Sequence, residues 1–165
     1  MSSARLPGKV MLELSGKPVI EQIFHQLSFS KKLADVVLAT STSKEDEVLT
    51  EWAKNNNIKY FTGSLDNVLQ RFYESAKKYR AEIIVRITGD CPLIDPEVID
   101  KMIEQFLNSD LDYLTNNNPP TFPDGLDVEI FTFSKDWKFL ILLDFVVWLA
   151  KWDKLPIIGG FVGEF

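Results

Sequence analysis

Residues 82–96 read EIIVRITGDCPLIDP, and this stretch decides the expected fold. The apolar run at 82–87 is of the kind that is buried on both faces of a parallel sheet. A short polar loop follows at 89–95, and Pro96 suits the first turn of a helix that extends through Phe106. This order of strand, loop and helix is typical of an α/β protein.

The same alternation continues in both directions from this stretch. The expected elements are a helix that begins at Pro18, a strand at 35–40, a helix within 41–56, a strand at 58–63, a helix within 64–79, and strands around 112–116 and 127–131. Ser43 and Asp46 have capping-box spacing at the start of the second helix. The alternation predicts an open, mostly parallel sheet with helices on both faces, in which ligands bind beyond the carboxyl ends of the strands.

The composition indicates one acidic globular domain. The chain has 165 residues, of which 45% are hydrophobic and 25% charged, so it can bury one core. A net charge of -6 argues against a nucleic-acid partner. Cys91 is the only cysteine, and we expect a protein of the reducing cytoplasm. The apolar run from Phe139 to Ala150 contains Asp144 and is too short to span a membrane, which takes about 20 residues.

The loop SSARLPGK at residues 2–9 is a candidate phosphate-binding loop. It has one glycine where a Walker P-loop needs two, and it lacks the glycine triplet of dinucleotide-binding proteins. Arg5 and Lys9 flank a Pro-Gly turn and could place two cations around a polyphosphate. An ordinary solvated turn explains the same residues equally well.

The loop at 89–95 gives a sharper signal. Asp90 directly follows Gly89 at the end of an apolar strand, where a carboxylate has no packing role and is available to hold a metal ion. Asp95 immediately precedes Pro96, so helix capping is the favoured interpretation for this second aspartate. We therefore expect Asp90 to be a metal ligand and Asp95 to be a helix cap.

Five ordered blocks carry a resemblance to a known family. They are residues 2–23, 36–47, 63–79, 84–100 and 122–131. Together they resemble the cytidylyltransferases of spore-coat polysaccharide biosynthesis, which are related to the CMP-Kdo and CMP-acylneuraminate synthetases. The resemblance implies a Rossmann-like nucleotide-diphospho-sugar transferase fold over residues 1–133. It also implies transfer of a nucleoside monophosphate from CTP to a sugar, with Mg²⁺ as cofactor and pyrophosphate as product.

The resemblance also assigns roles to individual residues. Arg5 and Lys9 fall on the loop that holds the triphosphate, and Asp90 falls on the aspartate that holds Mg²⁺, so these three are the catalytic candidates. Further nucleotide-binding candidates are Ser3, Lys17, Thr40, Ser41, Gly63, Ser64 and Gly89, although a helix cap explains Ser64 equally well. Asp127 and Glu129 lie two apart on one strand face and are candidates for a second metal contact or for sugar recognition.

Two other readings of the sequence stay open. Asp110 and Asp112 form a D-x-D pattern that a metal-dependent glycosyltransferase of similar fold would use, but their expected position favours a turn. A catalytically poor remnant that binds nucleotide or a partner is the other alternative. His25 is expected at the surface, away from the apolar face of its helix. The expected partners are CTP and a sugar, and a homodimer is possible.

Both ends of the sequence depart from the family pattern. Relatives have an apolar strand immediately before the position of Met1, in the centre of the sheet, and this sequence lacks that strand. Two explanations are open: the start codon was assigned at an internal methionine, or the gene product is truncated. Residues 134–165 resemble nothing in the family and are treated as an atypical tail. The run at 139–150 has the length to supply a buried strand or a covering helix, or to promote self-association.

Overall fold

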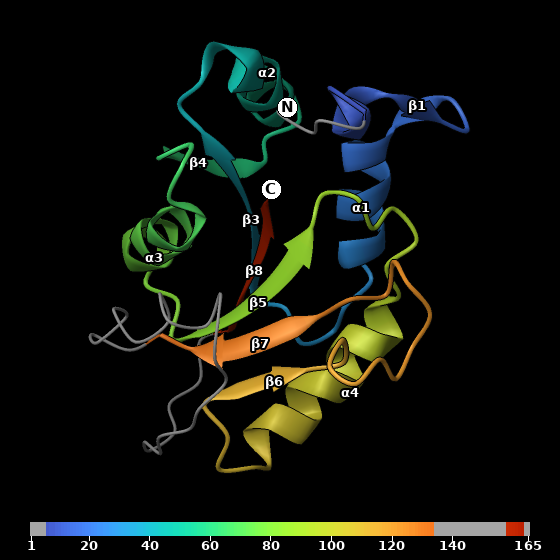
Figure 1. Cartoon of the computed structure of the whole chain (residues 1–165), viewed down its shortest axis with the longest axis vertical. Helices are drawn as coiled ribbons and strands as arrows, with labels where there is room; N and C mark the ends of the chain where they lie inside the picture. Colours follow the sequence, from blue (N-terminus) through green and yellow to red (C-terminus); the bar gives the residue numbers. More distant parts are fainter. Residues whose placement is uncertain (1–5, 134–157, 164–165) are drawn as a thin grey trace.

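In the described part of the chain, six strands form one sheet in the order β4-β3-β8-β5-β7-β6 (Figure 1). The computed structural model describes residues 6–133 and, as backbone alone, residues 158–163. The strands are β3 (Asp35–Ser41), β4 (Lys59–Gly63), β5 (Ile83–Thr88), β6 (Tyr113–Thr115), β7 (Glu129–Thr132) and β8 (Ile158–Gly163). β4, β3, β8 and β5 run parallel, whereas β7 is antiparallel to both β5 and β6. The predicted mostly parallel sheet is confirmed.

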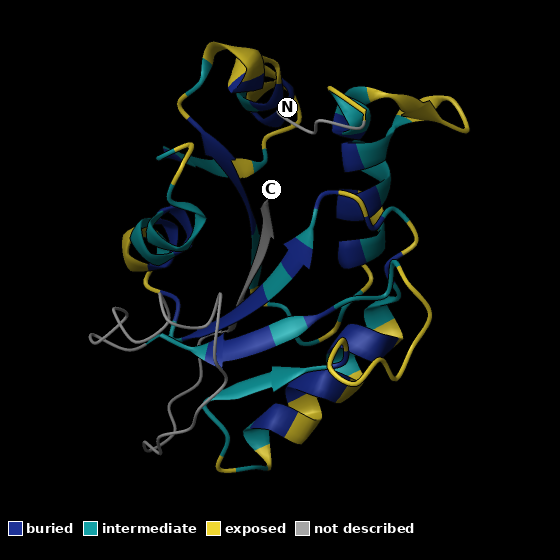
Figure 2. Ribbon diagram, viewed as in Figure 1, coloured by how far each residue is buried: buried dark blue, intermediate teal, exposed yellow. Residues whose placement is uncertain are grey.

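Helices cover both faces of this sheet. They are α1 (Val19–Leu27), α2 (Glu47–Asn55), α3 (Val68–Tyr79) and α4 (Pro96–Leu107). Buried residues of α1, α2 and α4 share one core on one face, and those of α3 form a smaller core on the other (Figures 1 and 2). Within the described residues, no helix has the length and apolar character needed to cross a membrane.

The first described residues form a small substructure that precedes the sheet. A single 3₁₀ turn, η1 (Lys9–Met11), leads into a hairpin of β1 (Glu13–Leu14) and β2 (Lys17–Pro18), which ends where α1 begins. The hairpin is solvent-exposed (Figure 2). Gly8, which precedes η1, has a φ of 70°, a left-handed conformation that glycine adopts without the steric cost of a Cβ.

Local capping explains where α4 begins, whereas the cap predicted for α2 is not formed. The Asp95 carboxylate accepts the Glu97 N–H at 2.8 Å, so the predicted cap of α4 is confirmed. The predicted capping box of α2 is wrong, because Ser43 makes no side-chain cap bond and Asp46 turns inward instead. A 3₁₀ turn, η2 (Lys44–Asp46), therefore precedes α2.

The position between β3 and β5 is filled by β8. Gly160 pairs with Val36 of β3 on one side and with Val85 of β5 on the other, both in parallel register. The sheet described here thus has a central strand, supplied from within residues 134–165. The segment that we expected to supply one, 139–150, lies outside the described residues.

Candidate functional site

An ion pair joins the N-terminal loop to the end of β5. Lys9 Nζ of η1 lies 2.7 Å from Asp90 Oδ2, and Asp90 stands just beyond the last residue of β5. The structure therefore brings together two candidates that are 81 positions apart in the sequence. They meet at the carboxyl ends of the parallel strands, where open α/β sheets bind ligands.

The Asp90 carboxylate is held in its charged form. Partial burial raises its pKa, but hydrogen bonds from Lys9 and Thr88 and the Lys9 charge outweigh that effect, so the pKa is lowered. Its side chain is 51% exposed. Asp90 is thus an ionised, accessible oxygen donor with a cation beside it.

A second carboxylate, that of Asp127, lies two residues before the neighbouring strand β7. β5 and β7 pair Arg86 with Glu129, and continuing this antiparallel register places Asp127 opposite Thr88. The pKa of the Cys91 thiol is raised chiefly by burial. The Asp127 charge also raises this pKa, and a hydrogen bond with the Asp127 backbone lowers it. Since Cys91 directly follows Asp90, the loops that carry Asp90 and Asp127 are neighbours.

The carboxylates of Asp90 and Asp127 suit Mg²⁺ better than they suit a metal ion whose ligands all come from the protein. Among the residues that the structure describes, no group of three or more His, Cys, Asp or Glu side chains could hold a metal. Mg²⁺ is usually bound through one or two carboxylates together with substrate phosphates and water. The carboxylates of Asp90 and Asp127, in neighbouring loops, fit a donor set of that kind.

The end of β3 is organised by a buried carboxylate. Asp46 accepts hydrogen bonds from Thr40 Oγ1 at 2.9 Å and from Ser41 Oγ at 2.5 Å, and also from the Ser41 N–H. Burial raises the pKa of Asp46, but hydrogen bonds that include those from Ser41 and Thr40 lower it overall. Sequence reasoning missed this role, although two hydroxyls at the end of a buried strand signal the need for an internal partner.

The last residue of β4, Gly63, is packed against α3. A Cβ placed on Gly63 would lie 2.9 Å from Phe61 Cε1 and 3.1 Å from Arg71 Cγ, so the backbone approaches these side chains as only glycine allows. Ser64 Oγ accepts the Asn67 N–H, and the cap of α3 is Asn67. The alternative that Ser64 caps the helix is therefore wrong.

Glu129 is engaged by two neighbouring strands. Its Oε2 pairs with the Arg86 guanidinium of β5, and its Oε1 accepts from the Tyr113 hydroxyl of β6 at 3.0 Å. Burial, and then the Glu129 charge, raise the pKa of Tyr113 to about 12. Both carboxylate oxygens of Glu129 thus have partners within the sheet.

We expect Tyr113 to ionise only near pH 12. Because its folded pKa lies above the unfolded value of about 10, the stability that this group contributes is complete below pH 10 and is lost as the pH rises through 12. Absorbance titration of the wild type and Tyr113→Phe measures this directly. A transition near pH 12 should be present in the wild type and absent from the variant; identical curves would contradict the assignment.

The other predicted positions are less closely tied to this site. Lys17 lies in the exposed hairpin and pairs with Glu21 at 2.8 Å. His25 is exposed on α1, as predicted. Asp112 Oδ1 accepts from Thr132 Oγ1 at 3.2 Å, so it joins β6 to β7 as a local structural contact. Gly89 is buried beside Asp90. Ser3 and Arg5 lie outside the described residues.

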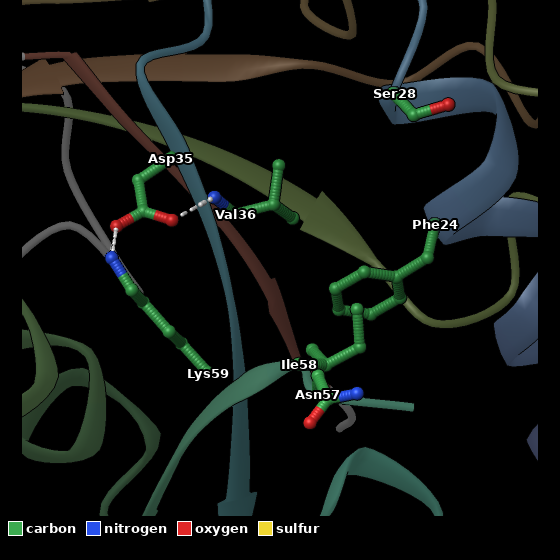
Figure 3. A pocket seen from close by; sticks show the side chains of 7 residues that line it. All are labelled: Phe24, Ser28, Asp35, Val36, Asn57, Ile58 and Lys59. Carbon is green, nitrogen blue, oxygen red and sulfur yellow. Dashed lines mark hydrogen bonds and ion pairs between the residues drawn. The ribbon is translucent and has the colours of Figure 1, made fainter. Parts of the chain in front are cut away.

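A pocket of about 260 Å³ lies at the opposite, amino ends of β3 and β4 (Figure 3). It is lined by Phe24, Ser28, Asp35, Val36, Asn57, Ile58 and Lys59. Its acid and base, Asp35 and Lys59, form an ion pair with each other. The pocket therefore offers little unpaired charge to a polyphosphate, and its position separates it from the Lys9–Asp90 site.

Several known proteins are similar to this chain in sequence or in fold. The cytidylyltransferase family model matches residues 1–134. An uncharacterized protein of Methanocaldococcus jannaschii is 41% identical over 139 residues, which are 82% of this chain and 56% of that protein. The spore coat polysaccharide biosynthesis protein SpsF of Bacillus subtilis is 32% identical over 124 residues, which are 73% and 52% of the two chains. The chain spans about half the length of these relatives.

A solved structure agrees with both the sequence match and the fold. It is a cytidylyltransferase from Leptospira borgpetersenii, with a TM-score of 0.75 and 38% identity. The superposition covers 90% of this chain and 62% of that one. The family-model match over residues 1–134 includes the N-terminal loop, the β5 loop and every described strand except β8. This chain therefore belongs to the cytidylyltransferase family.

Proposed function

We propose that the protein transfers a cytidine monophosphate group from CTP to a sugar used in polysaccharide synthesis and releases pyrophosphate. The observation that carries this proposal is the Lys9–Asp90 pair at the carboxyl ends of the strands, in a chain of the cytidylyltransferase family. A cation and an ionised carboxylate at one point suit a ligand that combines phosphate with a divalent metal. SpsF supports the polysaccharide context through its name alone.

The proposed reaction is a displacement at the α-phosphorus of CTP. A hydroxyl oxygen of the sugar forms a bond to this phosphorus and its proton passes to water, while the bond to the bridging oxygen breaks and pyrophosphate leaves with that electron pair. Negative charge builds on the phosphoryl oxygens and on the departing group, so fixed cations lower the barrier more than a protein nucleophile would. Lys9 and Arg5 are both proposed to hold the phosphates.

Asp90 is the residue proposed to hold Mg²⁺, with Asp127 as a second contact. Its carboxylate is ionised and accessible, which a hard cation requires. When bound, Mg²⁺ supplies positive charge beside the phosphate oxygens. Without a bound ligand, Lys9 balances the charge of Asp90. Under this proposal, Mg²⁺ would replace Lys9 as the cation that balances Asp90 when CTP binds. An alternative role for Asp127 is recognition of the sugar.

Nucleotide binding tests the proposal most directly. We expect Lys9→Ala to weaken Mg²⁺–CTP binding by about tenfold or more, because a hydrogen bond to a charged group contributes about 1.5 kcal/mol or more. Arg5→Ala is expected to act in the same direction. The measurement is calorimetric titration of each protein with CTP in the presence of Mg²⁺.

His25→Ala is the matched control, since His25 is an exposed basic side chain on α1, outside the loop. It should bind Mg²⁺–CTP as the wild type does. Equal losses in Lys9→Ala and His25→Ala, or no loss in either, would count against a phosphate-binding role for this loop.

A further inference from the structure

Asn116 holds the two peptide groups on either side of Asp127. Its Nδ2 donates to the Leu126 carbonyl at 2.7 Å, and its Oδ1 accepts from the Val128 N–H at 2.8 Å. Asn116 is only 5% exposed, so these bonds are made away from water. One planar amide thus fixes the backbone immediately before and immediately after a single carboxylate residue.

The main chain of Asn116 closes the same loop. Its N–H donates to the Val128 carbonyl at 3.4 Å, and its carbonyl accepts from the Thr121 N–H at 2.9 Å. Position 116 comes next in the β6–β7 register after Thr115, which pairs with Glu129. The loop between β6 and β7 therefore leaves the sheet at Asn116 and returns to it at Val128, and hydrogen bonds of Asn116 join these two ends.

The joined ends of this loop lie beside the Lys9–Asp90 site. The Asp127 charge and backbone act on the Cys91 thiol, which directly follows Asp90, and continuing the β5–β7 register by two residues places Asp127 opposite Thr88, whose Oγ1 lies 3.2 Å from Cys91 Sγ. We propose that Asn116 is a positioning residue that holds Asp127 so that it shares Mg²⁺ with Asp90 when CTP binds. This inference rests on the proposed function, and it selects the metal contact for Asp127 over sugar recognition.

Asparagine suits this role because one short side chain must both donate and accept. Aspartate would keep the acceptor for the Val128 N–H but would turn an oxygen toward the Leu126 carbonyl. Alanine would leave a buried carbonyl and a buried N–H without these partners, and the backbone around Asp127 would relax. Partners of this kind, which orient metal ligands, typically change metal affinity by about 10- to 100-fold when they are replaced.

A double-mutant cycle tests whether Asn116 acts through Asp127. Calorimetry gives the Kd for Mg²⁺–CTP in the wild type, Asn116→Ala, Asp127→Asn and the double variant. We expect each single change to weaken binding by about tenfold and the double variant to be weaker than the wild type by about the same factor. A residue that only positions Asp127 has nothing left to contribute once the Asp127 charge is gone.

Asn117→Ala is the matched control. Asn117 is the next residue and is exposed, and its side chain makes no hydrogen bond within the described part of the chain. Its substitution should leave the Kd unchanged. Thermal denaturation of every variant shows whether it is folded. If Asn116→Ala is unfolded, Asn116→Asp, which keeps the bond from the Val128 N–H, replaces it in the cycle with the same expected non-additivity.

Three results would overturn the inference, and they differ from one another. Multiplied losses of about 100-fold in the double variant would show that Asn116 acts independently of Asp127. Loss in Asp127→Asn with none in Asn116→Ala would show that Asp127 needs no such support, whereas no loss in Asp127→Asn would remove its role as a metal contact. A wild type that does not bind Mg²⁺–CTP contradicts the proposed function itself, and the inference with it.

Discussion

Replacing Asp90 with asparagine is expected to lower turnover by about 100-fold or more. Asparagine keeps the size and one oxygen of the side chain but removes the charge that is proposed to hold Mg²⁺. Loss of a single electrostatic group at a reacting phosphoryl or acyl centre commonly costs about 100- to 1,000-fold. The measurement is the rate of pyrophosphate release from CTP, with the sugar that the wild type accepts best.

Two further measurements make this result specific to the Asp90 charge. Asp95→Asn is the matched control: it removes the charge of a second carboxylate in the same loop, and asparagine caps a helix about as well as aspartate, so thermal stability and turnover should both stay near those of the wild type. Mg²⁺–CTP affinity, measured by calorimetry, should fall in Asp90→Asn. Full turnover and unchanged affinity in Asp90→Asn would show that Asp90 holds no metal.

Placing proline at Gly160 is expected to destabilise the whole sheet. Gly160 pairs with Val36 and with Val85, so it lies in the middle of a strand that has neighbours on both sides. Proline removes its N–H, and the buried carbonyl left without a donor costs about 1–3 kcal/mol, before the poor fit of the ring in a central strand is added. At this chain length, about 1 kcal/mol moves the Tm by roughly 2–4 °C.

The experiment is thermal denaturation followed by circular dichroism. We expect the Tm of Gly160→Pro to fall by at least about 5 °C, or the variant to lose cooperative unfolding. Gly160→Ala keeps the N–H and separates the loss of the backbone donor from the addition of a side chain. A proline variant that melts together with the alanine variant would show that residues 158–163 do not pair between β3 and β5.

Much of the sheet could be predicted because its signals are local. The apolar run of β5 and the cap at Asp95 are both readable within a few residues, and both are present in the structure. Lys9 and Asp90 were each singled out by their loops. Their contact follows from the parallel order of the strands, which brings carboxyl ends to one edge.

The parts that were missed depend on distant partners. β8 reads IGGFVG and has no alternating pattern, so its pairing is set by β3 and β5 and not by its own sequence. Asp46 has the spacing of a helix cap, but its carboxylate accepts hydrogen bonds from two buried hydroxyls of β3 instead. Asn116 carries no motif at all, and its role is visible only once β6 and β7 are paired.

The central position of β8 also affects the order in which the chain folds. β3 pairs with β4, and β7 pairs with both β5 and β6, over shorter sequence separations than those that join β8 to the sheet, so these two halves can form early. Asp35 pairs with Gly159, and closing so long a loop carries an entropic cost before any contact offsets it. Folding should therefore pause with two half-sheets whose inner edges are unpaired, and these edges expose the intermediate to aggregation until β8 inserts.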